Sequence, residues 1–305
     1  QYTDTKASVD IQTDSLEINV SDANRAVGLR AEGIGANVLV RPTVDPDSHV
    51  SDGPLTVIIN STITGPEQLN GIAIEAFNGG RVTINANQNN GYGDFRVNEA
   101  YNNKVQLNGD VVASNDRDYR NDDGYEAKVE ILTYKGHDTV EVDGDVNAGY
   151  MGSFKIETED GNDLVSLGGV SATEGGHVFV NAGEGNDVIK LDGKVVGTDE
   201  NGNPDFSHVN IHGGSGNDLL VLSAPNSALF SEWYQAWLES GGLNNVDCEG
   251  LIIQGVTNQG QIAWLLGLAE SLGINVQLYG PDVNINLASD VSQVADLDLN
   301  GDTAN

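Results

Sequence analysis

Three aspartates recur at one kind of position, directly after a glycine-rich turn and directly before a run of apolar residues. They are Asp163, Asp187 and Asp218, in the stretches EDGNDLVSL, AGEGNDVIKL and GGSGNDLLVL. Carboxylates supply hard oxygen ligands, and glycines let the backbone turn tightly enough to aim carbonyl oxygens inward. Ca2+ takes about six to eight such oxygens. The pattern therefore indicates calcium binding, provided that these turns come together in the fold.

The aspartates mark the corners of a longer internal repeat. An earlier unit, VEILTYKGHDTVEVDGDVNA, supplies Asp138, and the four corners are then 25, 24 and 31 residues apart. The longest interval contains TDENGNPDFS, residues 198–207, which is typical of a surface loop. A more divergent unit, NNKVQLNGDVVAS, places Asn103 at the corner position.

Each repeat divides into three short strands, for example VEIL, TVEV and VNA. Alternation along these strands directs Val129, Ile131 and Val140 inward and Glu130 and Glu141 outward. A three-stranded unit of about 25 residues predicts one coil of a mainly β fold, a right-handed parallel β-helix, in which each strand pairs with its counterpart in the next coil. The alternative is a β-sandwich or a series of immunoglobulin-like modules, which would need longer strands and a spacing of about 100 residues.

Stacked coils would also stack their corner aspartates. Neighbouring strands lie about 4.8 Å apart, so a column of ionised carboxylates would repel unless a cation lay between them. We therefore expect calcium at these corners. The alternative is a set of metal-free turns in which Asn162, Asn186 and Asn217 stack as an amide ladder.

The stretch GGSGNDLLV resembles the glycine-rich nonapeptide G-G-x-G-x-D-x-U-x, with U apolar, of the RTX or hemolysin-type calcium-binding repeats. AGEGNDVIK has Ala182 in place of the first glycine, TEDGNDLVS matches in part, and TYKGHDTVE keeps only Gly136, Asp138 and Val140. The resemblance covers residues 133–221. It implies export from a Gram-negative bacterium, ordering of the repeat by external calcium, and Ca2+ held between stacked turns by the aspartate and by glycine-region carbonyls. The implied ligand set is Asp163, Asp187, Asp218, Gly161, Gly183, Gly185, Gly214 and Gly216.

Two departures from the family pattern limit the expected site. RTX nonapeptides usually run in tandem, whereas this chain has one per coil, so we expect at most one column of calcium ions. At Asp138, the neighbouring Lys135 and His137 reduce the local acidity, and we expect a turn without metal there.

Net charge restricts the possible partners. The chain of 305 residues has 46 acidic and 14 basic side chains, a formal net charge of −32. Such a surface repels nucleic acid and anionic lipid and attracts divalent cations. No apolar run approaches the roughly 18 residues of a membrane span. The single cysteine, Cys248, excludes an internal disulfide, and because the chain begins at Gln1 we expect a preceding segment, for which a cleaved signal peptide is one explanation.

The sequence pattern changes after Pro225. SALFSEWYQAWLESGG, starting at a candidate N-cap, Ser227, and QIAWLLGLAESLG both have apolar residues at helical spacing. We expect these helices to cap or flank the last coils and to cover the open end of the solenoid. All three tryptophans lie on them, where packing is the favoured role and a sugar-binding surface the alternative.

The expected organisation has four parts: N-terminal strands or a cap in 1–53, the β-helix in 54–225, a mixed α/β cap in 226–290 and an acidic tail in 291–305. The tail reads ADLDLNGDTAN and resembles the opening of an EF-hand or dockerin calcium loop. Its twelfth position would lie beyond Asn305, so the loop is incomplete as given. The candidate ligands there are Asp296, Asp298, Asn300 and Asp302.

Together these features predict a calcium-stabilised structural or binding module of a secreted or cell-surface bacterial protein, such as an adhesin, an exoprotein or a toxin repeat region. Its expected partners are calcium ions and host or matrix glycans or surface proteins. The alternative is a carbohydrate-active β-helix enzyme, such as a polysaccharide lyase, epimerase or hydrolase. That function would require a groove pairing two carboxylates with a basic residue such as Arg96 or Arg117.

Overall fold

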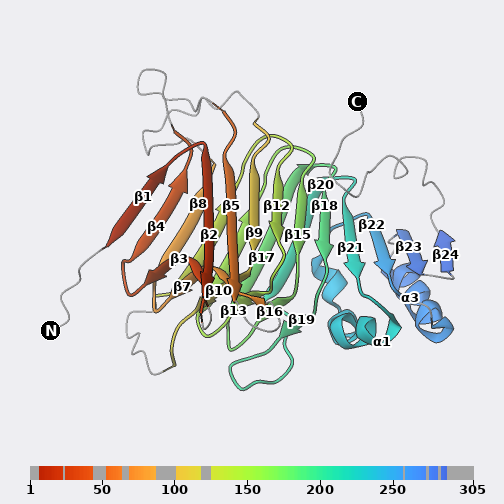
Figure 1. The fold of residues 1–305 in the computed structure, drawn as a ribbon. Coiled ribbons are helices and arrows are strands. Elements are labelled where there is room, and N and C mark those ends of the chain that lie inside the picture. Colours follow the sequence, from red (N-terminus) through yellow and green to blue (C-terminus); the bar gives the residue numbers. More distant parts are fainter. Residues whose placement is uncertain are drawn as a thin grey trace.

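The chain winds into a parallel β-helix whose strands stack in three sheets (Figure 1). The structure is a computed structural model. It describes residues 7–22, 25–43, 53–63, 69–86, 101–117, 125–256, 258–272, 275–280 and 283–286. Up to residue 223, successive coils visit the three sheets in the same order, and strands of neighbouring coils pair in parallel. The predicted parallel β-helix is thereby confirmed, and VEIL, TVEV and VNA lie in three consecutive strands of one coil.

The first sheet contains seven strands in the described part of the chain. In spatial order they are β1 (Ser8–Gln12), β4 (Asn37–Arg41), β8 (Arg81–Asn85), β11 (Ala127–Leu132), β14 (Gly152–Glu157), β17 (His177–Gly185) and β20 (Val209–Gly216). The third sheet runs β19 (Val195–Gly197), β16 (Val170–Ala172), β13 (Val146–Ala148), β10 (Asp110–Ser114), β7 (Ile72–Phe77) and β3 (Val27–Glu32).

The second sheet is the longest and continues past the other two at the C-terminal end. Its parallel strands are β2 (Ser15–Asp22), β5 (Thr56–Ile63), β9 (Lys104–Asn108), β12 (Thr139–Val142), β15 (Leu164–Leu167), β18 (Val188–Leu191), β21 (Leu219–Ser223), β22 (Gly250–Gln254) and β23 (Asn275–Gly280). Two antiparallel strands join them: β6 (Leu69–Asn70) pairs with β5, and β24 (Val283–Asn286) pairs with β23.

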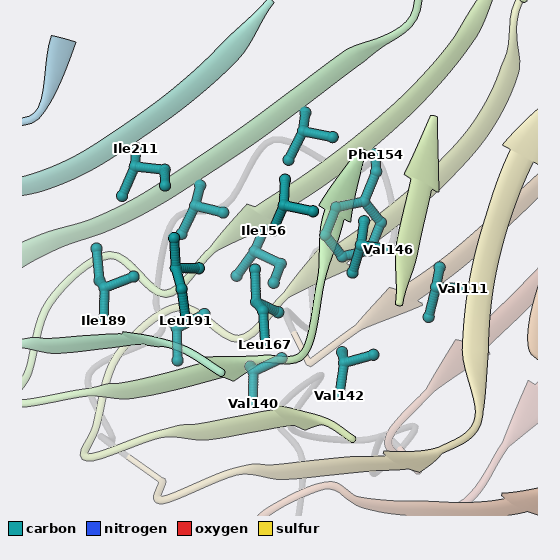
Figure 2. Close-up of a cluster of buried hydrophobic side chains, with 14 of the residues drawn as sticks. Val111, Val140, Val142, Val146, Phe154, Ile156, Leu167, Ile189, Leu191 and Ile211 are labelled. Carbon is teal, nitrogen blue, oxygen red and sulfur yellow. The ribbon is translucent and has the colours of Figure 1, made fainter. Parts of the chain in front are cut away.

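Aliphatic side chains fill the interior because inward positions repeat in register from coil to coil. Val129 of β11 faces Phe154 of β14, and Ile131 faces Ile156, and all four are fully buried. Figure 2 shows a cluster of the buried side chains inside the coils, with Phe154 and Ile156 among those labelled. Each buried Val, Leu, Ile or Phe contributes about 1.5–3 kcal/mol relative to an exposed one. The predicted inward positions are confirmed.

Helices cover the C-terminal end of the coils. They are α1 (Ser227–Phe230), the π-helix η1 (Ser231–Gln235), α2 (Ala236–Glu239), the 3-10 helix η2 (Gly242–Asn245) and α3 (Gln259–Leu272). The N-cap of α1 is Asn226 rather than the predicted Ser227, because the Asn226 side chain accepts the amide protons of Ala228 and Leu229. No helix within the described residues combines the length and apolarity needed to cross a lipid bilayer.

Aromatic packing fixes this cap. Phe230, Tyr234 and Trp237 are buried in the hydrophobic core, and Trp233 and Trp264 pack partly buried against it. This placement favours packing over a sugar-binding surface for the tryptophans.

The Tyr234 hydroxyl connects the cap to two strand ends. Its oxygen lies 2.7 Å from the carbonyl oxygen of Leu191 and 2.8 Å from that of Ser223. We expect Tyr234→Phe to lower the free energy of unfolding by about 1–2 kcal/mol, because it deprives buried carbonyls of their donor without emptying the pocket. Urea denaturation followed by circular dichroism checks this, and an unchanged midpoint would contradict it.

Candidate functional site

The corner between the first and second sheets stacks four aspartates, Asp138, Asp163, Asp187 and Asp218, which we call the aspartate column. Each precedes a strand of the second sheet, and strand register places them directly above one another. These four residues are 1, 3, 0 and 2 % exposed, in that order. The stacking expected from the sequence is therefore present, but the carboxyls point into the protein rather than into solvent.

One oxygen of each carboxyl is used for a hydrogen bond between coils. The amide of Asp163 donates to Oδ1 of Asp187 at 2.8 Å, and the amide of Asp187 donates to Oδ1 of Asp218 at 2.9 Å. The same bond links Asp138 to Asp163, and the series continues backwards through Asn103. The side chains thus satisfy backbone amides where the chain turns away from the regular sheet.

The second oxygen, Oδ2, is buried in each member of the aspartate column and lacks a hydrogen-bond partner within the described structure. Thr158 lies beside Asp163, but its hydroxyl donates its proton to the carbonyl of Ala182 at 2.8 Å and therefore does not donate it to Oδ2 of Asp163. At the last corner only a glycine occupies the equivalent position: a Cβ on Gly213 would lie 2.7 Å from Oδ2 of Asp218. An unsatisfied buried carboxylate oxygen is costly, so the aspartate column requires a proton or a cation.

Burial raises the pKa of every carboxyl in the aspartate column. The pKa of Asp138 is raised to about 6, that of Asp163 to about 8 and that of Asp187 to about 7, and that of Asp218 is also raised. Desolvation is the largest cause in each case, and repulsion from a neighbouring carboxyl adds to it at Asp163, Asp187 and Asp218. At pH 7 a metal-free column would therefore hold Asp163 mostly protonated, Asp187 about half protonated and Asp138 mostly ionised.

The glycines of the corner adopt conformations that other residues avoid. Gly183 and Gly214 have φ of 110° and 105°, and Gly185 and Gly216 have φ of 151° and 148°. A Cβ on Gly216 would lie 1.4 Å from the carbonyl oxygen of Gly185, so the carbonyl of one coil points directly at the backbone of the next. Gly161 repeats this geometry with φ of 150°.

The corner keeps its backbone path even where glycine is lost. Glu159 and Tyr134 occupy the positions equivalent to Gly183 and Gly214, and their φ values of 65° and 71° are also positive. Carboxylate oxygens and closely stacked carbonyls are the donor types that Ca2+ takes. These donor types are present in the predicted ligand set, Asp163, Asp187, Asp218, Gly161, Gly183, Gly185, Gly214 and Gly216.

The predicted amide ladder is also present, on the outer side of the same corner. The amide of Asn186 donates to Oδ1 of Asn162 at 2.8 Å, and the amide of Asn217 donates to Oδ1 of Asn186 at 2.9 Å. This ladder runs in the opposite direction to that of the aspartates. It does not use the Oδ2 atoms, so both ladders coexist.

Sequence reasoning missed Glu249, which continues the column beyond Asp218. The amide of Asp218 donates to Oε2 of Glu249 at 2.8 Å, and Leu219 pairs with Gly250 in register. The sequence contained a signal for it: Glu249 follows Asp218 by 31 residues, the same interval as between Asp187 and Asp218, and one glycine separates it from the apolar run LII. Glu249 and Asp247 are exposed and help to raise the pKa of Asp218.

Of the other predicted residues, only Arg117 lies within the described part of the chain. Asp296, Asp298, Asn300 and Asp302 lie outside the described residues, as does Arg96. Arg117 pairs with Glu174 at 2.6 Å on the surface. Among the residues that the structure describes, no three His, Cys, Asp or Glu side chains converge as a metal cluster. A calcium ion at the corner would therefore depend on backbone carbonyls as well as carboxylates.

No protein-family model, no curated protein and no solved structure matches this chain significantly.

Proposed function

We propose that this chain is a calcium-stabilised structural and binding module of a secreted or cell-surface bacterial protein, such as an adhesin, an exoprotein or a toxin repeat region. One observation carries the proposal: Asp187 and Asp218 are stacked and buried, and each keeps a carboxylate oxygen without a hydrogen-bond partner. The net charge of −32 concentrates divalent cations around the chain.

Calcium would replace the protons of the aspartate column. Its ligands would be the carboxylates of Asp163, Asp187 and Asp218 and carbonyl oxygens of the glycine-rich corners. In a solenoid each coil contacts only its neighbours, so stability depends on the interfaces between coils. A cation shared by two corners would strengthen such an interface directly.

The binding role rests on the architecture. Stacked coils present long, regular outer faces of the kind that repeat proteins use for extended partners. Host or matrix glycans and surface proteins are the partners that we propose, with calcium setting the rigidity of the surface that they meet.

Calcium titration of the chelator-treated protein at pH 8 tests the proposal. We expect calcium at about 100 times its dissociation constant to stabilise the fold by about 2.7 kcal/mol, which for a chain of this length corresponds to roughly 4 °C in melting temperature. Scanning calorimetry measures this shift. Asp187→Asn should abolish most of it, because the amide keeps the acceptor oxygen but removes the charge.

Glu200→Gln is the matched control, because Glu200 is exposed on the loop between β19 and β20 and the variant loses the same charge. It should respond to calcium like the original chain. An equal shift in Asp187→Asn, or a melting temperature unaffected by chelator, would reject the calcium site. Release of unsaturated or reducing ends from acidic polysaccharides would instead support the carbohydrate-active alternative.

A further inference from the structure

A pair of histidines lies away from the aspartate column, on the first sheet. His177 begins β17, and His208 directly precedes β20, the neighbouring strand. Their Nδ1 atoms are 2.9 Å apart, and their ring centroids are 4.3 Å apart at an interplanar angle of 81°. The loop 198–207 separates the two residues in sequence, and strand pairing brings them together.

The distance between the two nitrogens suits a shared metal ion. Metal–imidazole bonds are about 2.0–2.1 Å long, so two nitrogens at right angles around one ion lie about 2.9 Å apart. A linear N–H···N hydrogen bond of this length would separate the ring centroids by roughly 5 Å. The observed centroid distance of 4.3 Å is shorter, so the rings are tilted off the line that joins the nitrogens.

Acidic side chains near the two histidines make the local electrostatic potential favourable for a cation. Oδ2 of Asp205 lies 3.9 Å from Nε2 of His208 and places a negative charge beside the pair. Glu126 adds a second negative charge near His177.

The site also has an open side. His177 is exposed and His208 is partly exposed, so an ion can enter from solvent and complete its coordination with water. The right-angle spacing is that of tetragonal Cu2+ and Ni2+ sites, and imidazole suits both ions.

We propose that His177 and His208 form a two-histidine site for a divalent transition-metal ion, with Cu2+ and Ni2+ preferred. Ca2+ prefers hard oxygen ligands and does not compete for imidazole nitrogen. The site is therefore independent of the proposed calcium column.

Titration with CuCl2 in the presence of excess CaCl2, followed by calorimetry and electron paramagnetic resonance, tests the proposal. The calcium occupies the many surface carboxylates and leaves the histidines available. We expect one Cu2+ per chain with hyperfine coupling to two nitrogens. Loss of an outer-shell partner of a ligating histidine typically weakens binding roughly 10- to 100-fold, so His177→Ala and His208→Ala should each weaken it at least that much and leave one coupled nitrogen.

His212→Ala is the matched control. His212 is a histidine of β20 itself, and its Nδ1 lies 3.4 Å from Asp247 rather than near the pair. This variant should bind Cu2+ like the original chain. Absence of stoichiometric binding, or binding that survives His177→Ala and His208→Ala in variants with unchanged circular dichroism, overturns the proposal and leaves the contact as a hydrogen bond between imidazoles.

Discussion

Replacing Gly216 by alanine should lower the free energy of unfolding by roughly 3–5 kcal/mol, from steric overlap and backbone strain together. The added Cβ would lie 1.4 Å from the carbonyl oxygen of Gly185, in a backbone that does not yield without breaking the corner. The φ of 148° is a second penalty, because L side chains rarely adopt it. Urea denaturation measures the loss.

Gly202→Ala separates the two causes. Gly202 also has a positive φ, 82°, but a Cβ there would meet nothing within 4 Å. This control should lose only the conformational part, about 1–2 kcal/mol. Equal losses in the two variants would show that the stacked carbonyl of Gly185 does not constrain the corner.

The metal-free protein should become less stable as pH rises from 5 to 9. Burial raises the folded-state pKa of Asp138, Asp187 and Asp163 to about 6, 7 and 8, above an unfolded value near 3.8. An acid with a raised folded pKa contributes stability that is fully present below the unfolded pKa and is lost as pH rises through the folded pKa. At about 1.4 kcal/mol per pKa unit, the loss is on the order of several kcal/mol.

Melting temperatures measured in chelator between pH 5 and 9 check this expectation, with about 0.5 M NaCl present to screen repulsion between surface charges. Asp163→Asn should reduce the dependence of melting temperature on pH at the high-pH end of the range, and Glu200→Gln should leave that dependence unchanged. Saturating calcium should reduce the pH dependence of melting temperature in the original chain, because a bound cation stabilises the ionised carboxylates. A melting temperature that rises with pH in chelator would contradict protonation of the aspartate column.

Much of the solenoid is predictable because its determinants are local. The alternation in VEIL and TVEV sets the strand lengths, and the Gly-x-Asp corner sets the turns. The repeat sets the register between coils. The stacking of Asp163, Asp187 and Asp218 follows from that register alone. Burial of the carboxyls could not be predicted, because the direction of the side chain depends on which backbone amides the corner leaves unpaired.

Most of the features that the sequence did not predict depend on contacts between residues far apart in the chain. Glu249 was missed because the helices between β21 and β22 interrupt the repeat, although the coil resumes in register after them. His177 and His208 meet only because the inserted loop returns the chain to the next coil at the right point. Asn226 replaces Ser227 as the N-cap because its side chain reaches two amides at once.

The two ladders of the corner also determine how the molecule responds to tension. Every bond in them joins one coil to the next, and none skips a coil. A pull along the axis stretches the full set of strand and corner bonds of a coil at the same time and is resisted collectively. A pull on one chain end breaks only the bonds of the outermost strand, so the rod peels from its ends while its middle stays intact.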